Sequence, residues 1–119
     1  MDGQIATWRG SFGVVDAVHK GEGEATLYHL PDGRTILRLE RFRVTNGLDL
    51  YVYLSRHPAP RSSAELHQDP DYEVAVLKGN VGDQNYELPA DWEIEGVQSV
   101  VIFCKRFTTV FSTAELQLA

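Results

Sequence analysis

The feature that most constrains this fold is an alternation of apolar and polar residues with a period of two, which recurs in short blocks along the chain. Residues 24–30 (EATLYHL) and 34–42 (RTILRLERF) carry it, and they flank the Pro-Asp-Gly of residues 31–33. Proline presets φ and glycine supplies a positive φ, so this arrangement predicts a β-hairpin. Because Leu37 and Leu39 alternate with charged residues, one face of the second strand is expected to be buried and the other exposed.

Other blocks predict the remaining strands of an antiparallel structure. Residues 99–104 (SVVIFC) form the most apolar run, which predicts a central strand covered on both faces. Residues 19–24 (HKGEGE) predict a turn, and residues 91–96 are expected to hold one helical turn at most. The other predicted strands are 11–15, 48–55, 73–77 and 85–88, with 110–111 and 116–118 closing the sheet. We therefore expect an all-β fold, a single antiparallel β-sandwich domain over residues 1–119, with a small closed β-barrel as the alternative.

The predicted strand at 48–55 (LDLYVYLS) has two chemically different faces. Leu50, Val52 and Leu54 share one face, which is expected to enter the core. The other face carries Tyr51 and Tyr53 with Asp49 and Ser55. If the two tyrosines point outward, this polar-aromatic face is a candidate binding surface. Residues 56–71 contain three of the five prolines, which predicts a long loop of the kind that often carries function.

Composition and charge exclude several classes of function. A chain of 119 residues is long enough for one compact domain with one core. Eleven basic and seventeen acidic residues give a net charge of −6, so no nucleic-acid partner is expected. The cluster of Arg38, Arg41 and Arg43 is interpreted as a solvated strand face. No run approaches the about 18 apolar residues of a membrane span, and the first residues lack the pattern of a signal peptide.

Cys104 is the only cysteine, so the fold cannot depend on an internal disulfide. It ends the 99–104 run and is followed directly by Lys105 and Arg106. In one interpretation it is buried and packs as a small hydrophobic residue. In the other, the two cations stabilise its thiolate, and it serves as a nucleophile, an electron carrier or an axial haem ligand. The spacing alone does not choose between these interpretations.

No other motif indicates a defined chemistry. The four histidines fall in three separate segments without the short paired spacing of a zinc site, and we predict no metal. His57 and His67 share the long loop and could converge on Asp69 or Asp71, although a solvated loop is the simpler interpretation. The motifs of serine hydrolases, phosphate-binding loops and zinc proteases are absent from the sequence. Hydrolysis and phosphoryl transfer therefore have no support.

Several blocks of the sequence, taken in order and at their spacing, resemble the DM13 domain family across nearly the whole chain. The matching segments are 10–12 (GSF), 19–23 (HKGEG), 37–42 (LRLERF), 47–55 (GLDLYVYLS), 77–80 (LKGN), 82–89 (GDQNYELP), 99–104 (SVVIFC) with Phe107, and 114–116 (AEL). The resemblance implies a small β-sandwich of extracytoplasmic settings, alone in bacteria or beside DOMON-type domains in animal cell-surface proteins, with a proposed role in electron transfer. The family's signature cysteine falls on Cys104, for which the resemblance implies a bare redox thiol or a ligand to a prosthetic group such as haem.

Two hypotheses of function follow. In the first, the chain is an electron-transfer module in which Cys104, as a bare thiol or through haem, exchanges electrons with a redox partner protein or a DOMON-type domain. In the alternative, Cys104 is core filler, and the 56–72 loop or a polar sheet face binds a protein or glycan partner without catalysis. The resemblance implies an extracytoplasmic location in both cases. A hydrolase or isomerase is disfavoured because no spacing places a base beside a nucleophile.

Overall fold

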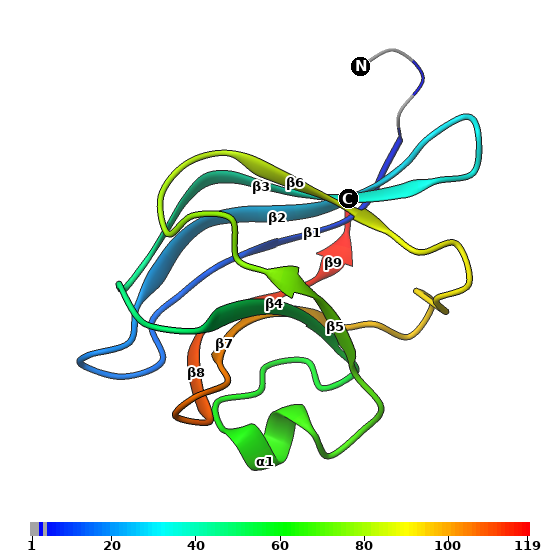
Figure 1. The fold of residues 1–119 in the computed structure, drawn as a ribbon. Coiled ribbons are helices and arrows are strands. Elements are labelled where there is room, and N and C mark those ends of the chain that lie inside the picture. The colour runs from blue at the N-terminus through cyan, green and yellow to red at the C-terminus, as the bar shows by residue number, and fades with distance from the viewer. Residues whose placement is uncertain (1–2, 4) are drawn as a thin grey trace.

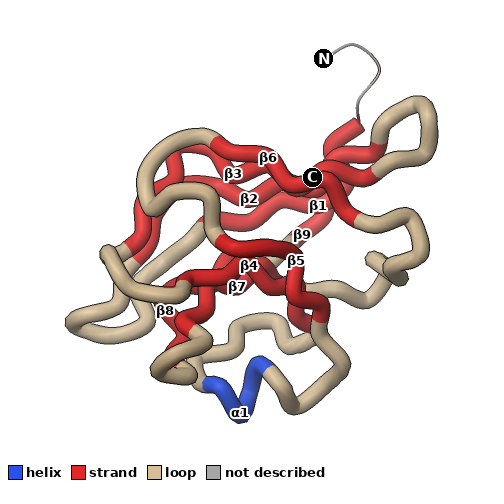
Figure 2. Tube along the Cα trace, viewed as in Figure 1, coloured by secondary structure: helices blue, strands red, loops and turns tan. Residues whose placement is uncertain are grey.

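The computed structural model describes residue 3 and residues 5–119, which form two antiparallel β-sheets lying face to face (Figure 1). The strands are β1 (Ile5–Ser11), β2 (Gly21–His29), β3 (Thr35–Val44), β4 (Leu50–Ser55), β5 (Tyr72–Val76), β6 (Gln84–Leu88), β7 (Ser99–Cys104), β8 (Thr109–Glu115) and β9 (Gln117–Leu118). One sheet has the order β6-β3-β2-β1-β9 and the other β5-β4-β7-β8. The described residues contain a single short helix, α1 (Ser63–Leu66), drawn in blue in Figure 2.

The arrangement of the sheet edges identifies the fold as a sandwich. Each sheet has two edge strands, β6 and β9 in the first and β5 and β8 in the second. A single antiparallel bridge between Phe12 and Ala114 links the sheets on the side of β1 and β8. Among the described residues no ladder joins β5 to β6, so the sheets do not close into a barrel. The predicted all-β sandwich is confirmed, and the barrel alternative is wrong.

The hairpin predicted around residues 31–33 is present between β2 and β3. Two backbone hydrogen bonds close its turn: the Leu30 amide donates to the Arg34 carbonyl at 2.9 Å, and the Gly33 amide donates to the Leu30 carbonyl at 3.0 Å. Gly33 has a φ of +91°, a conformation that glycine adopts without a steric penalty. Leu37 and Leu39 are fully buried, which confirms the predicted inner face of β3.

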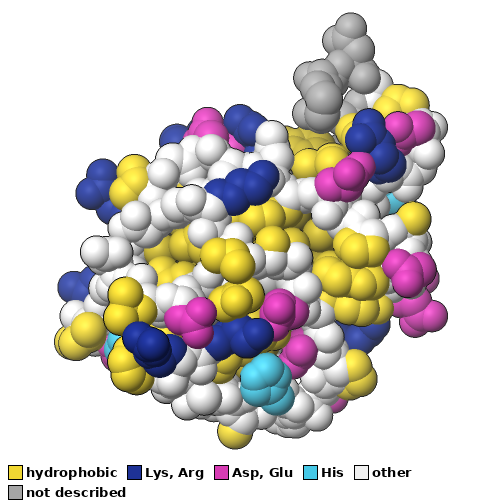
Figure 3. Space-filling view, viewed as in Figure 1, with side chains coloured by type: hydrophobic (Ala, Val, Ile, Leu, Met, Phe, Trp, Pro, Cys, Tyr) yellow, Lys and Arg dark blue, Asp and Glu magenta, His cyan; other side chains and the backbone are white. Residues whose placement is uncertain are grey.

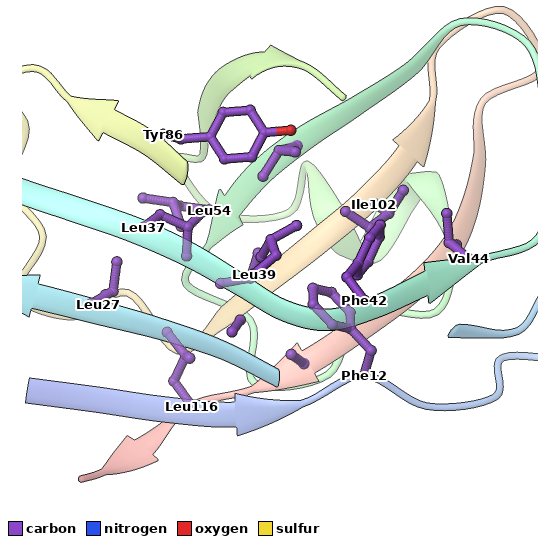
Figure 4. Packing of buried hydrophobic residues seen from close by; sticks show 14 of the residues in the cluster. Phe12, Leu27, Leu37, Leu39, Phe42, Val44, Leu54, Tyr86, Ile102 and Leu116 are labelled. Carbon is purple, nitrogen blue, oxygen red and sulfur yellow. The ribbon is translucent and has the colours of Figure 1, made fainter. Parts of the chain in front are cut away.

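The main core lies between the two sheets, where side chains from both layers point toward one another (Figure 4). The Phe12 and Phe42 rings meet edge to face with centroids 5.1 Å apart. Fully burying one such large apolar side chain contributes about 2 kcal/mol to stability. Strand β7 forms ladders with β4 on one side and β8 on the other, and all six of its residues are buried. The prediction that 99–104 is a central strand is therefore confirmed.

A second, smaller cluster covers the outer face of the four-stranded sheet. Tyr53, Val101 and Phe103 point to this face, and Leu66 of α1 packs over them. Tyr53 lies on the predicted face of β4, opposite the main core, but it is only 5% exposed, so it does not contribute to an open binding surface. The prolines of the 56–71 loop correctly indicated a connection without strands, but the loop folds back on the sheet and contributes its own core residue, Leu66. No helix among the described residues is long and apolar enough to cross a membrane.

The first strand differs from the prediction. The sequence indicated a strand at 11–15, whereas β1 ends at Ser11 and residues 12–15 make only isolated bridges. The alternation in β1 is hidden because its register against β2 shifts between Ala6 and Trp8. The predicted turn at 19–24 is also displaced, since β2 already begins at Gly21 and a further register shift against β3 falls beside Gly23.

Four connections meet at one end of the sandwich, on the left of Figure 1. They are residues 12–20 between β1 and β2, 45–49 between β3 and β4, 77–83 between β5 and β6, and 105–108 between β7 and β8. We call this the loop end. Because neighbouring strands are antiparallel, the C-terminus of β7 must point toward the loop end. The topology therefore places Cys104, the last residue of β7, directly beneath these four loops.

Candidate functional site

Cys104 is anchored by the most buried strand of the protein. Within β7 it pairs with Leu50 of β4 on one side and with Thr109 of β8 on the other. Its side chain is fully buried and belongs to the core between the sheets. The interpretation that Cys104 packs in the interior is therefore correct for its position. Any reagent or partner that reacts with the thiol must first gain access to a buried side chain.

One hydrogen bond connects this thiol to a surface loop. The Sγ atom of Cys104 donates to the carbonyl oxygen of Leu48 at 3.0 Å. Leu48 belongs to the connection at residues 45–49, and its side chain is 60% exposed. A residue that contacts the thiol through its backbone is thus in contact with solvent through its side chain. The 45–49 segment is therefore the cover that separates Cys104 from solvent at the loop end.

Contacts at both ends and in the middle hold the 45–49 segment in place. The Thr45 amide donates to the Lys20 carbonyl at 2.9 Å, and the Lys105 amide donates to the Asp49 carbonyl at 3.1 Å. Gly47 lies against the Phe111 ring so closely that an added Cβ would be 2.5 Å from Cε2 of that ring. The sequence alone did not indicate the role of this segment as a cover, because that role depends on the pairing of β4 with β7.

The cation expected to stabilise a Cys104 thiolate is held elsewhere. The Lys105 ammonium lies 2.7 Å from Oε1 of Glu73 and 4.4 Å from the centre of the Tyr51 ring. The hydrogen bond that Lys105 donates to Glu73 raises the pKa of Lys105. Lys105 begins the turn after β7 and is exposed, and its ammonium lies over Tyr51 on the outer face of the four-stranded sheet. Arg106 is exposed and has no ion pair among the residues that the structure describes.

Glu73 joins two residues that sequence analysis did not connect. The Tyr53 hydroxyl donates to Oε1 of Glu73 at 2.9 Å, beside the bond from Lys105. The bond from Lys105 is the main reason why the pKa of Glu73 is lowered, although partial burial opposes it. Burial of the phenol, followed by its bond to Glu73, raises the pKa of Tyr53. No sequence signal could have found this group, because it depends on the register between β4 and β5.

The histidines of the long loop each pair with one carboxylate. Nδ1 of His67 lies 2.7 Å from Oδ2 of Asp71, as the loop composition suggested, and Nε2 of His57 lies 3.7 Å from Oε2 of Glu65. Within residues 3 and 5–119, no three histidine, cysteine or acidic side chains gather in an arrangement suited to a metal ion. The two pairs do not converge on one site, so the structure assigns the loop no shared chemistry.

A haem bound through Cys104 does not fit the described conformation. An axial ligand must present its sulfur to an open space large enough for the macrocycle. The Cys104 side chain is fully buried, and its Sγ atom faces the Leu48 carbonyl. A nearby open pocket of about 380 Å³ is lined by residues of 14–22 and 43–45 and does not include Cys104. Without rearrangement, this site contains a single buried thiol, Cys104, which is hydrogen-bonded to the 45–49 segment above it.

Comparison with known proteins gives a match at the level of a protein family. No curated protein and no solved structure is detectably similar to this chain. A family model described as "Electron transfer DM13" matches residues 11–116, which include Cys104 and the 45–49 segment that covers it. The match spans nearly the whole sandwich, from the last residue of β1 to the residue before β9. The chain therefore belongs to the DM13 family, whose name describes electron transfer.

Proposed function

We propose that this domain takes part in electron transfer through Cys104, acting as a bare thiol. The observation that carries the proposal is the position of the only thiol, fully buried at the end of a central strand yet hydrogen-bonded to an exposed connection. Such a thiol is protected from random oxidation and becomes reactive when one short segment moves. The match to a family named for electron transfer supports the same assignment.

The chemistry available to Cys104 is limited to the reactions of one sulfur atom. Removal of one electron from a thiol releases one proton and leaves a thiyl radical. Formation of a disulfide with the thiol of a second molecule removes two electrons and releases two protons. Either reaction removes the S–H group, and with it the hydrogen bond to Leu48. Oxidation at Cys104 should therefore loosen the 45–49 segment.

A lone thiol needs an external electron acceptor or donor, so the proposal includes a partner. We propose a redox protein such as a DOMON-type domain, in an extracytoplasmic setting, as the family resemblance implies. The partner would approach at the loop end, since this is where Cys104 is hydrogen-bonded to an exposed connection. The bare thiol is favoured over haem because a fully buried sulfur leaves no open coordination position.

Two readouts on the purified protein test the assignment. The first is the rate at which Cys104 reacts with a chromogenic thiol reagent in the folded and the urea-unfolded protein. The second is a visible absorption titration with haem, with Cys104→Ser as the control. We expect slow but complete reaction of one thiol in the folded protein, and no Soret band that depends on Cys104.

Two results would contradict the proposal in different ways. A Soret band that is lost in Cys104→Ser would replace the bare thiol by a haem ligand. A thiol that reacts only after unfolding would remove the only candidate for a redox group. The non-catalytic binding module would then become the better account of the fold.

A further inference from the structure

We propose that the loop end docks on the surface of an anionic lipid bilayer, with exposed apolar side chains of separate loops inserting between the lipids. This inference concerns a different surface property from the redox role of Cys104 and does not depend on it. It follows from where the exposed apolar side chains lie, how they are spaced, and which charges surround them.

The exposed apolar side chains are concentrated at one end of the molecule. Eight large apolar side chains are exposed among the described residues, and five of them lie on the four connections of the loop end. These five are Val14 (61%), Val18 (66%), Leu48 (60%), Val81 (59%) and Phe107 (62%). Figure 3 shows hydrophobic and basic side chains next to one another along the left edge, where these connections lie. Scattered single apolar residues need no explanation, but a collection on one end does.

The spacing of these side chains suits lipid better than a folded protein. They come from four separate connections, with Val14 and Val18 sharing residues 12–20, so they project from several loops rather than from one strand or helix face. A protein interface needs a contiguous core packed as densely as a protein interior. A bilayer surface instead accepts individual apolar side chains among its headgroups, with aromatic rings favoured at that level.

The charges of the loop end favour an anionic surface. The four connections carry the basic residues Lys20, Lys78, Lys105 and Arg106 and the acidic residues Asp16, Asp49 and Asp83. Their balance is one positive charge, although the whole chain has a net charge of −6. The acidic excess therefore lies outside these four connections, and this difference in charge orients the molecule with its loops toward a negative surface.

Two of the cations are free to contact headgroups. Lys20 and Arg106 are exposed, and neither forms an ion pair in the part of the chain that the structure describes. Each neighbours an exposed apolar residue in sequence, with Val18 two residues before Lys20 and Phe107 directly after Arg106. Long basic side chains can reach the phosphate level while the adjacent apolar residue enters the acyl region.

Sedimentation with lipid vesicles tests this proposal on the whole chain. The vesicles contain phosphatidylcholine alone or with about 30% phosphatidylserine, which gives the negative surface potential that the cations require. The loop-end variant combines Val18→Asp with Phe107→Asp, which leaves Cys104 and the 45–49 segment unchanged. The matched control combines Ile5→Asp with Leu118→Asp, which makes the same change at residues that are 65% and 78% exposed and lie outside the four loops. Circular dichroism establishes that both variants are folded.

We expect the native protein and the control to bind the anionic vesicles, and the loop-end variant to bind about tenfold more weakly or not at all. Binding should fall as salt is added, because the headgroup attraction is screened. Absence of binding by the native protein, or equal loss in both variants, would overturn the proposal and leave the loop end to a protein partner. Equal binding to neutral vesicles would overturn the anionic assignment. Thiol reactivity of Cys104 is measured separately, so failure here is distinguishable from failure of the redox proposal.

Discussion

The Sγ atom of Cys104 donates a 3.0 Å hydrogen bond to the backbone carbonyl of Leu48, which links the end of the most buried strand to an exposed connection. The two segments that this bond joins are held very differently. Strand β7 forms ladders with a neighbour on each side, whereas the 45–49 segment is anchored by a few backbone hydrogen bonds. Local opening draws on the least stable parts of a fold. The reactivity of the thiol should therefore follow the stability of the cover rather than that of the whole domain.

The first prediction concerns the contribution of Cys104 to stability. Cys104→Ala removes a fully buried sulfur and its hydrogen bond, and should lower the free energy of unfolding by about 1 to 2 kcal/mol. Cys104→Ser keeps a donor for the Leu48 carbonyl but places a more polar group in the core. Urea unfolding of both variants measures the effect. A change near zero for Cys104→Ala would mean that the site is poorly packed.

The second prediction concerns the 45–49 segment that covers Cys104. A Cβ at Gly47 would lie 2.5 Å from Cε2 of the buried Phe111 ring, so Gly47→Ala must displace the ring or the segment. Overpacking of this kind costs about 1 kcal/mol of stability. If the free energy needed to open the 45–49 segment falls by the same amount, thiol labelling of Cys104 should become roughly fivefold faster. The reaction with a chromogenic thiol reagent measures the rate.

Gly13→Ala is the matched control for that experiment. Gly13 lies in another connection of the loop end, and an added Cβ there would meet nothing within 4 Å. Its labelling rate should equal that of the native protein. If Gly47→Ala labels no faster than this control, the 45–49 segment does not limit access to the thiol.

The third prediction concerns Glu73. The bonds from Lys105 and then from Tyr53 lower the pKa of this carboxyl, so its carboxylate stabilises the fold above the ordinary value of 4.5. That contribution is lost as the pH falls through the lowered pKa. Lys105→Met should move the pKa of Glu73 upward, and Tyr53→Phe should move it upward by less. A carboxyl-detected NMR titration measures both, and an unchanged value in Lys105→Met would contradict the ion pair.

The fourth prediction concerns the turn before β2. Oδ1 and Oδ2 of Asp16 both lie 2.9 Å from Nδ1 of His19. Hydrogen bonds from the His19 side chain, and then from the His19 and Val18 amides, lower the pKa of Asp16 from 3.8 to about 2. The stabilisation should therefore be present above pH 3.8 and disappear as the pH falls toward 2. In His19→Gln the pKa of Asp16 should rise, and NMR titration of the carboxyl carbon would refute the pairing if it does not.

The parts of the fold that local patterns encode were predictable from the sequence. The turn at 31–33 needs only its own proline and glycine, and the run at 99–104 is apolar enough to require cover on both faces. The first strand was displaced because a register shift near Trp8 breaks its alternation. The face of Tyr53 was predicted correctly, but its burial was not, because its cover, Leu66, comes from a distant loop that the local pattern of β4 does not contain.

The candidate site was predictable only in part, for the same physical reason. That Cys104 is the single thiol at a strand end follows from the sequence. Its hydrogen bond to Leu48 and the diversion of Lys105 to Glu73 depend on which strands pair and in which register. Long-range pairing is not encoded in short windows, so the sequence predicted the reactive group but not the contacts that control it.

The redox role of Cys104 is tested by equilibrating the folded protein with defined ratios of reduced and oxidised glutathione, followed by acid quenching and intact-mass measurement. We expect Cys104 to form a mixed disulfide with glutathione reversibly, in a fraction that follows the glutathione ratio, and we expect no adduct in Cys104→Ser. A native protein that stays unmodified at every ratio, and gains the adduct only when urea is added, would contradict a redox role for Cys104.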